Sequence, residues 1–598
     1  MAVQRRALLQ AAGVAGLAAA VPPSRATAVP RTLRVAFNIP ETGFDPLVAS
    51  DQVSLRVVAH IFESPLAYEH LARPAKLVPL TAAAMPEVSA DFRHFVFTIR
   101  PGIFFADDPA FGGRPRELVA ADYVYSVKRF YDPALRTEHL YQFENAKILG
   151  LSELRRRALR ERTPFPYDTE VEGLRVLDRH RFEVRLAEPA PRFLALWATT
   201  QFTGAVAREV VQAYADDLLA HPVGTGPFRL AQWRRASRIV LERNPRFREQ
   251  IYRSDAPADD ADAQAEAARL RGQRLPLLDR IEVSIIEESQ PRWLAFLNGE
   301  HDLITPLPPD LASVALPGGQ LAPYLAKRGV QLHRTLQATT THTFFNCEDA
   351  TVGGNSPQQV ALRRAIALAF DSREEIRLVL QGQAEPAQAM IAPHCYGFEP
   401  ALRSEMGEAS AVRARALLDL HGFVDRNGDG WRERPDGSPL LLRRAFPPDQ
   451  RSRQQSELWA KRMRAVGLRM QFEVAPFSAL IQRSLAGQLM MWGFSWGAGN
   501  PDGDFYLGLA YGPNAEQSND ARFRLAAFDR LYERQRVLPD GPERLALMHQ
   551  ATRLMLAYVP YIAHAHPYAN DLMHAHVQGH RRHPFASDWW RTVSVDAG

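Results

Sequence analysis

The stretch VGTGPFRLAQW (Val223–Trp233), followed by SRIVLERN (Ser237–Asn244), carries the strongest fold signal in the sequence. Two glycines and a proline open it, and they favour a turn because glycine tolerates backbone angles that other residues avoid. Two runs rich in apolar residues follow, with the short segment RRA between them. Two such runs around a short polar segment predict a β-hairpin.

Strand and helix patterns surround this hairpin without a regular alternation. TLRVAF (32–37) and LDRIEVSII (278–286) are typical of strands, and FRHFVFTIR (92–100) alternates apolar and polar residues in the same way. ELVAADYVYSVKRFYDP (117–133) predicts an amphipathic helix, and QVALRRAIALAFD (359–371) predicts a second helix. Because we find no internal repeat, the sequence as a whole predicts a mixed α/β fold.

The bulk composition is that of a large globular protein. The chain has 598 residues, of which 46% are hydrophobic and 23% are charged, which is enough for several lobes with their own cores. The segment 254–274 is rich in alanine and aspartate and predicts an exposed insertion. The formal net charge is +5, and near-neutrality gives no support for a nucleic-acid partner, so we expect none.

The first 28 residues predict an export signal rather than a part of the fold. Arg5 and Arg6 precede a short apolar run, and Ala26-Thr27-Ala28 fits a cleavage site. The adjacent arginines and the weak hydrophobicity favour a twin-arginine signal, while an ordinary secretory signal that carries two arginines stays open. Either way, we expect the mature protein to be exported to the periplasm.

The sequence contains two cysteines, Cys347 and Cys395. An exported protein folds in an oxidising compartment, where one disulfide between them would form if their positions in space allow it. Two buried free thiols are the alternative, and the sequence does not choose between them.

One stretch spells a hydrolase motif. LMMWGFSWGAGNPDGDF (Leu489–Phe505) contains Gly-x-Ser-x-Gly around Ser495, which in serine hydrolases marks a nucleophile between a strand and a helix. The residues after Ser495 are rich in glycine, with a proline, and are poor helix formers. We therefore interpret Ser495 as a strand-end residue, and a secreted serine hydrolase stays a remote alternative.

A second stretch has calcium-loop spacing. In DRNGDGWRERPD (Asp425–Asp436), Asp425, Asn427, Asp429 and Gly430 match the early positions of an EF-hand loop. The twelfth position holds Asp436 instead of the usual glutamate. Because Asn-Gly and Asp-Gly also favour hairpin turns, we favour a turn, and calcium binding is left open.

Histidines gather near the end of the chain, at His564, His566, His574, His576, His580 and His583. Imidazole suits zinc, nickel or copper, so a metal- or haem-binding receptor that uses them is an alternative function. Phosphate loops, His-Glu-x-x-His and paired Cys-x-x-Cys motifs are all absent from the sequence. The absence of strong catalytic signatures favours a binding protein over an enzyme, and we expect no cofactor.

Several stretches, in their order along the chain, resemble one family. They are FNIPETGFDPLVASD (37–51), RELVAADYVYSVKRFYDP (116–133), VGTGPFRLAQW with VLERNPRF (223–247), LDRIEVSIIEESQPRWLAFLNGEHDLI (278–304), FFNCED with ALRRAIALAFDSREEI (344–376), AVGLRMQFE (465–473), WGAGNPDGDF (496–505) and SNDARFRLAAFDRLYE (518–533). The chain is similar to the extracytoplasmic solute-binding proteins of ABC importers, family 5, which include oligopeptide-, dipeptide- and nickel-binding proteins. The resemblance covers essentially the whole mature chain.

This resemblance implies a two-lobed periplasmic binding protein of type II, an α/β fold of the Venus-flytrap kind with an extra α+β domain inserted in the first lobe. It places the first lobe at 29–64, 201–340 and 556–598, the extra domain at 65–200 and the second lobe at 341–555. The lobes would be joined by a pair of crossing strands, and hinge closure would trap a ligand between them.

The resemblance also gives a role to the stretch around Ser495. In peptide-binding relatives the segment reads Trp-x-x-Asp, and that aspartate pairs with the α-amine of the peptide. Here the tryptophan is Trp496, and Gly499 stands where the aspartate would be, which removes the charge that neutralises a buried ammonium. Asp502 or Asp504 of the same loop would be a substitute.

The expected ligand-binding residues are therefore Trp496, Gly499, Asn500, Asp502 and Asn519. The structural alternatives are that Trp496 packs at a strand end and that Asn519 caps a turn. The expected function is that of a monomeric receptor, which captures a peptide or another medium-sized solute and delivers it to an ABC permease in the inner membrane.

Overall fold

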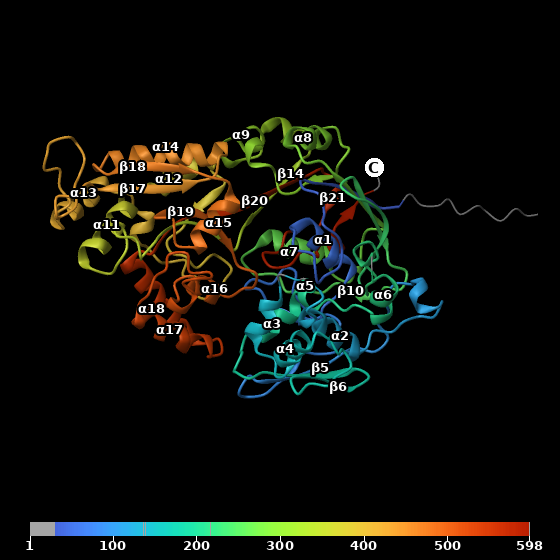
Figure 1. Cartoon of the computed structure of the whole chain (residues 1–598). Coiled ribbons are helices and arrows are strands. Elements are labelled where there is room, and N and C mark those ends of the chain that lie inside the picture. Colours follow the sequence, from blue (N-terminus) through green and yellow to red (C-terminus); the bar gives the residue numbers. More distant parts are fainter. Residues whose placement is uncertain (1–29, 136, 138, 216, 597–598) are drawn as a thin grey trace, which may run out of the picture.

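The computed structural model describes residues 30–135, 137, 139–215 and 217–596. It contains two bodies, one coloured blue to green and one mainly yellow to orange, and the chain passes between them more than once (Figure 1). The predicted export signal, residues 1–28, lies outside the described residues. No helix among the described residues is long and apolar enough to cross a membrane.

A large sheet runs through both bodies in the order β18-β17-β19-β15-β20-β13-β1-β12-β9-β8. Its strands are β1 (Thr32–Phe37), β8 (Phe228–Arg234), β9 (Arg238–Arg243), β12 (Arg280–Ile285), β13 (Leu303–Ile304), β15 (Thr339–Phe345), β17 (Leu441–Phe446), β18 (Arg469–Val474), β19 (Met491–Gly497) and β20 (Tyr561–Met573), and β14 (Gln331–Leu336) and β16 (Ala384–Pro386) pair with β20 off this path. The strands from β13 to β8 belong to the first lobe, and those from β18 to β15 belong to the second lobe.

The predicted hairpin is confirmed as β8 and β9, which pair antiparallel from Phe228 with Arg243 to Arg234 with Arg238. Its opening glycines are required by a close approach of two backbones. A Cβ atom on Gly224 would lie 2.0 Å from the carbonyl oxygen of Ile61, and one on Gly226 would lie 2.6 Å from that of His60. No other residue fits there, so the turn locks the hairpin against the end of α1 (Gln52–Ile61).

Two crossing segments connect the lobes. The first half of β20 pairs with β15 of the second lobe, and its last six residues pair with β14 of the first lobe. Between the two halves, the Gln337 amide donates a hydrogen bond to the Pro567 carbonyl oxygen at 3.0 Å. The chain therefore crosses twice between the lobes at adjacent points, which are where the hinge implied by the resemblance would lie and are called the hinge below.

The helices cover the sheet on each side. In the first lobe they are α1, α6 (Arg208–Ala213), α7 (Ala261–Leu270), α8 (Ser289–Leu297), α9 (Ala312–Ala315) and α10 (Pro323–Ala326), with the short strand pairs β10 (Gln250–Ile251) with β11 (Arg274–Leu275) and β21 (Val577–Gln578) with β22 (Ser594–Val595). In the second lobe they are α11 (Pro357–Ala369), α12 (Ser372–Leu378), α13 (Ala411–Leu420), α14 (Gln450–Arg464), α15 (Phe477–Leu485), α16 (Asp504–Gly508), α17 (Ala526–Arg536) and α18 (Pro542–Tyr558).

The insertion predicted at 254–274 is only partly exposed. It forms α7, and Ala263, Ala267 and Leu270 on one face of this helix are buried. The helix packs its apolar face against Leu71 and Tyr252. More than half of the residues of 254–274 are exposed, as the composition predicts, and the three buried ones recur at helical spacing on one face of α7.

The extra domain is built on a separate sheet with the order β4-β5-β7-β6. Its elements are β4 (Glu87–Val88), β5 (His94–Thr98), α2 (Ala120–Tyr131), α3 (Leu140–Ala146), α4 (Leu151–Glu161), β6 (Leu174–Asp178), β7 (Arg181–Arg185) and α5 (Thr200–Thr203), and the strand pair β2 (Leu66–Tyr68) and β3 (Leu77–Pro79) leads into it. Phe97 and Phe182 stack in its core with ring centroids 4.8 Å apart, and Trp197 packs on both rings.

A buried ion pair ties the extra domain to the first lobe. Arg129 of α2 forms two hydrogen bonds with the Asp45 carboxylate, at 2.7 and 3.0 Å. The side chains are only 3% and 5% exposed. Removal of one partner would leave the other charge buried and unpaired, which is costly.

We expect the Arg129→Met variant to lose about 3–5 kcal/mol of unfolding free energy, because Asp45 would stay buried without a counter-charge. The half-exposed pair between Arg31 and Asp279 is the control, and Arg31→Met should cost less than about 1 kcal/mol. Urea unfolding followed by circular dichroism measures both values. Equal losses in the two variants would contradict a structural role for the buried pair.

Candidate functional site

Trp496 lies next to the hinge. It occupies the penultimate position of β19, where it pairs with Thr340 of β15, and the next pair is Gly497 with Thr339. Its partly buried ring packs edge-on against Phe494 and Phe505, at centroid distances of 5.4 and 5.7 Å. The loop that follows β19 therefore starts beside the point where the lobes join.

Ser495 sits inside β19, paired with Thr341, and not at a turn between a strand and a helix. The strand continues to Gly497, and the next helix, α16, begins only at Asp504. The geometry of a nucleophile elbow requires the serine at the strand-to-helix turn. The expectation that Ser495 is a strand residue is confirmed.

The loop after β19 is held by a second loop that runs beside it. The Tyr396 amide donates to the Pro501 carbonyl oxygen, and the Gly503 amide donates to the Tyr396 carbonyl oxygen, both at 2.9 Å. Within this loop Gly499 is exposed, Asn500 is partly buried and Asp502 is buried. The expected binding residues from Gly499 to Asp502 thus have different exposures along four residues of chain.

Each oxygen of the Asp502 carboxylate meets a guanidinium. Arg544, which is fully buried, lies 2.7 Å from Oδ1, and Arg192 lies 3.2 Å from Oδ2. The neighbouring Asp504 has a raised pKa, because burial disfavours its charge and the negative charge of Asp502 adds to this effect. Asp504 also accepts a hydrogen bond from Gln535. The acidic side chains of this loop are therefore already partnered within the protein.

Arg192 reaches this loop from the extra domain. Besides the ion pair with Asp502, its guanidinium donates to the carbonyl oxygens of Leu538, at 3.0 Å, and of Arg536. Both carbonyls follow α17 in the second lobe or lie at its end. A single side chain thus links the extra domain to the second lobe across the space between them.

A cavity of about 950 Å³ lies between the lobes. On one side it is lined by residues 73–75 and 259–262, and on the other side by residues 394–398, Pro501 and Leu545. Volumes of a few hundred to about 1,000 Å³ are typical of sites for small and medium-sized ligands. The cavity therefore has the position and the size that the hinge predicts.

The second-lobe wall of this cavity carries two aromatic rings and one acidic side chain, Asp540, which pairs with Arg544 at 2.6 Å. Tyr396 and Phe398 contribute rings, and the His394 ring contacts the Leu336 carbonyl oxygen at 2.9 Å, next to the hinge. Burial lowers the pKa of His394 and raises the pKa of the Cys395 thiol, so both groups are uncharged at neutral pH. No sequence pattern predicted this wall, because residues 394–398 form no recognisable motif.

Two other sequence predictions have a different outcome in the structure. Asn519 is fully buried, and its side chain donates to the carbonyl oxygens of Tyr511 and Phe523, at 3.1 and 2.9 Å. It therefore caps a turn and does not line the cavity. Cys347 and Cys395 are both free, so the alternative with two thiols describes the structure.

The C-terminal histidines do not converge on one point. His564 and His566 are buried in β20 and contact the hydroxyl groups of Thr343 and Thr340, at 2.9 and 3.2 Å. His580 contacts Asp571 at 2.9 Å. Among the described residues, the side chains that could share a metal ion do not include any of these histidines. No observation in the described structure therefore favours the metal or haem alternative.

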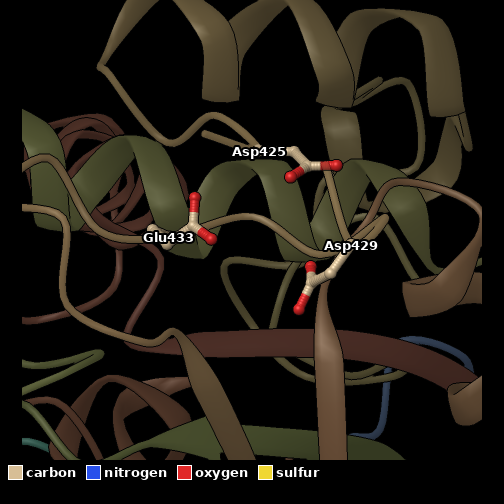
Figure 2. A group of neighbouring side chains, drawn as sticks. All are labelled: Asp425, Asp429 and Glu433. Carbon is tan, nitrogen blue, oxygen red and sulfur yellow. The ribbon is translucent and has the colours of Figure 1, made fainter. Parts of the chain in front are cut away.

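The acidic loop at Asp425 brings three carboxylates together, as Figure 2 shows for Asp425, Asp429 and Glu433. Their oxygens lie within 4.8 Å of one another. Asp425 already accepts hydrogen bonds from the amides of Gly428 and Gly430, at 2.7 and 2.9 Å. Glu433, rather than the expected Asp436, completes the group, while Asp436 caps its own turn through Ser438. These bonds within the loop are those of the turn that the sequence favoured.

We expect the Arg192→Met variant to open the free protein, because it removes the ion pair and two hydrogen bonds between the extra domain and the second lobe. Solution X-ray scattering should show a larger radius of gyration than for the wild type. The control is Lys147→Met, which breaks an exposed ion pair with Glu188 inside the extra domain. If both variants scatter like the wild type, Arg192 does not hold the lobes together.

Comparison with known proteins gives one family and a consistent fold. The model of the bacterial extracellular solute-binding proteins, family 5 (middle) matches residues 76–518. The di/tripeptide-binding protein 2 of Pseudomonas aeruginosa is 24% identical over 95% of this chain and 96% of its own. The heme-binding protein A of Haemophilus influenzae is 25% identical over 85% of this chain and 83% of its own.

Two solved structures extend the comparison to the fold. The unliganded open form of the periplasmic murein tripeptide binding protein MppA gives a TM-score of 0.71 at 18% identity, over 95% of this chain and 97% of that one. HbpA2 from Haemophilus parasuis also gives a TM-score of 0.71 at 18% identity, over 95% of this chain and 100% of that one. These likenesses confirm the predicted fold class, a two-lobed α/β protein with an extra domain.

Proposed function

Because the chain belongs to the bacterial extracellular solute-binding proteins of family 5, we propose that it is the substrate-binding component of an ABC importer. It captures a peptide or another medium-sized solute between its lobes by hinge closure and delivers it to a membrane permease. We further propose that it is periplasmic and monomeric. The members of this family are binding proteins, and we propose no catalytic role for Ser495.

The observation that carries this proposal is the cavity of about 950 Å³, which lies beside the two crossing strands. Its one wall comes from the first lobe and the extra domain inserted in it, and its other wall comes from the second lobe. A ligand that contacts both walls binds the closed arrangement better than the open one. Such differential affinity is what shifts a two-state equilibrium toward closure. We keep the lobe and domain limits that the resemblance implies as part of this proposal.

The charged side chains at the cavity rim indicate which groups of a solute would bind there. Asp259 and Asp262 line the first-lobe side and form no ion pair with a described residue. Asp502 is occupied by Arg192 and Arg544, so it offers little charge to a ligand while the lobes are together. A peptide amine would therefore meet the rim aspartates rather than the loop after Trp496. Of the loop after Trp496, Pro501 lines the cavity, and none of the five residues expected from sequence does in this arrangement. We retain Trp496, Gly499, Asn500 and Asp502 as part of the proposed site because they belong to the same strand end and loop as Pro501, and we leave out Asn519, which caps a turn.

We expect a mixture of di- and tripeptides to raise the melting temperature of the purified protein, because ligand binding to the folded state alone stabilises it. At a ligand concentration of 100 times the dissociation constant the gain is about 2.7 kcal/mol. Differential scanning fluorimetry measures the shift.

A matched pair of variants tests whether the stabilising ligand sits between the lobes. Leu545 lines the cavity from α18, and the next residue, Ala546, is exposed and does not line it. Leu545→Trp should reduce the peptide-induced shift, because the larger ring intrudes into the cavity at this wall, and Ala546→Trp should leave it intact. An undiminished shift in Leu545→Trp, or no shift in the wild type with any peptide, would contradict the proposal.

A further inference from the structure

A second cavity, of about 570 Å³, lies between the first lobe and the extra domain, beside the cleft. It is lined by residues 67–70 and 78–80 of the extra domain, and by residues 248–255 around β10 and residues 583–592 of the first lobe. The segments 67–70 and 248–255 lead into residues 73–75 and 259–262, which line the cavity between the lobes. The two cavities are therefore neighbours along one stretch of the extra domain and one of the first lobe.

Four buried donors and one buried acceptor on the wall of this second cavity have no partner among the described residues. The donors are the hydroxyl of Tyr68, Nε2 of His583, Nε1 of Trp589 and Nε of Arg591, and the acceptor is Oε1 of Gln250. Tyr68, His583 and Trp589 are only 7%, 4% and 4% exposed. Buried polar groups in folded proteins nearly always have a partner, so a set of unpaired ones around a cavity, most of them donors, calls for an explanation.

The protonation of His583 can be assigned from its contacts. Its Nδ1 accepts a hydrogen bond from the Phe585 amide at 3.0 Å, so in the neutral ring the proton is on Nε2. The pKa of His583 is well below its ordinary value because the ring is buried and lies near Arg73. His583 is therefore a neutral ring that presents one N–H group at the cavity.

The donors are held in place by aromatic and cationic neighbours. The rings of Tyr68 and His583 stack with centroids 5.6 Å apart. The guanidinium groups of Arg56 and Arg582 lie over the Trp589 ring, at 5.0 and 5.1 Å. Fixed donors select a ligand more sharply than mobile ones, because little side-chain entropy is lost on binding.

The cavity wall carries equal numbers of basic and acidic side chains, so its charge favours neither an anionic nor a cationic ligand. Four arginines and four acidic side chains line it: Arg100, Arg248, Arg253, Arg591, Glu69, Glu249, Asp255 and Asp588. The unpaired donors therefore determine which ligand group fits. The N–H groups of the tryptophan and of the neutral histidine can only donate a hydrogen bond there. A group that satisfies them must present acceptor oxygens. One carboxylate has about four acceptor positions on two oxygens, and a carbonyl oxygen has two.

We propose that this cavity receives an oxygen-bearing end of the transported solute, a carboxylate or a carbonyl group, which accepts hydrogen bonds from Tyr68, His583 and Trp589. This inference rests on the proposed function and adds the chemistry of one end of its solute. Closure secures this end, because Phe585, which packs on the Tyr68 ring at 6.0 Å, also packs against the core of the second lobe.

The test compares variants that remove single donors. Tyr68→Phe and Trp589→Phe should each weaken the binding of a di- and tripeptide mixture by about tenfold, the usual effect of one lost hydrogen bond in a site. Tyr68→Phe should leave the melting temperature of the free protein unchanged or higher, because it removes a buried unpaired hydroxyl. The control is Tyr131→Phe, whose buried hydroxyl also lacks a described partner but lies in the core of the extra domain.

A second experiment compares peptides that have a free C-terminus with peptides that have an amidated C-terminus. If amidation weakens wild-type binding and the loss is smaller in Tyr68→Phe, the bound group is the carboxylate; if amidation has no effect but both variants bind weakly, it is a carbonyl. Wild-type affinity in both Tyr68→Phe and Trp589→Phe would overturn the inference and leave the proposed function standing. If the wild type binds no peptide of either kind, the proposed function falls, and this inference falls with it.

Discussion

The structure depends on one strand that serves both lobes. The backbone of β20 is hydrogen-bonded to β15 on the second-lobe side and to β14 on the first-lobe side, and the change occurs at Pro567. Each half of β20 is hydrogen-bonded to a neighbouring strand of its own lobe. Neither lobe can therefore move without its half of β20. Relative motion is therefore confined to the few residues at the crossing. Trp496 and the cavity wall at His394 lie within a few residues of this point.

The two sides of the cleft satisfy their polar groups in different ways. On the second-lobe side, Asp502, Arg544, Gln535 and Asp504 are joined in one network, which Arg192 completes from the extra domain. Such a network is expensive to disturb, because each buried charge needs its partner. It is best understood as a rigid wall. Donors without a partner among the described residues remain at Tyr68, His583 and Trp589 on the other side of the cleft and at Trp496 in the second lobe, so specificity is expected to reside at these groups.

Much of the fold could be predicted from the sequence, because its signals are local. The glycines of 223–226 and the two apolar runs after them predicted β8 and β9, and Asp51 caps α1 through the Ser54 amide at 2.7 Å. The resemblance supplied the two-lobed arrangement, which periodicity alone does not give. In the segment 254–274, composition predicted the exposure of most residues but not the helix α7, whose buried face consists of Ala263, Ala267 and Leu270.

The candidate site was harder to predict, because its contacts join distant parts of the chain. Arg192 and Asp502 are separated by 310 positions, and no motif marks either of them. Asn519 lies within a family-like stretch, yet the hydrogen bonds of its side-chain amide are made within the turn that it caps. The donors Tyr68, His583 and Trp589 come from both ends of the chain, and only the fold brings them to one cavity.

The central claim is that the lobes close on a solute about the crossing strands. The most direct test is a pulsed electron–electron distance measurement between spin labels at Asp262 and Ala546, which are exposed on opposite sides of the cleft. Cys347 and Cys395 would be replaced by serine to make the labels unique. The account predicts that a bound peptide shortens this distance and narrows its distribution. An unchanged distance at saturating peptide would contradict it.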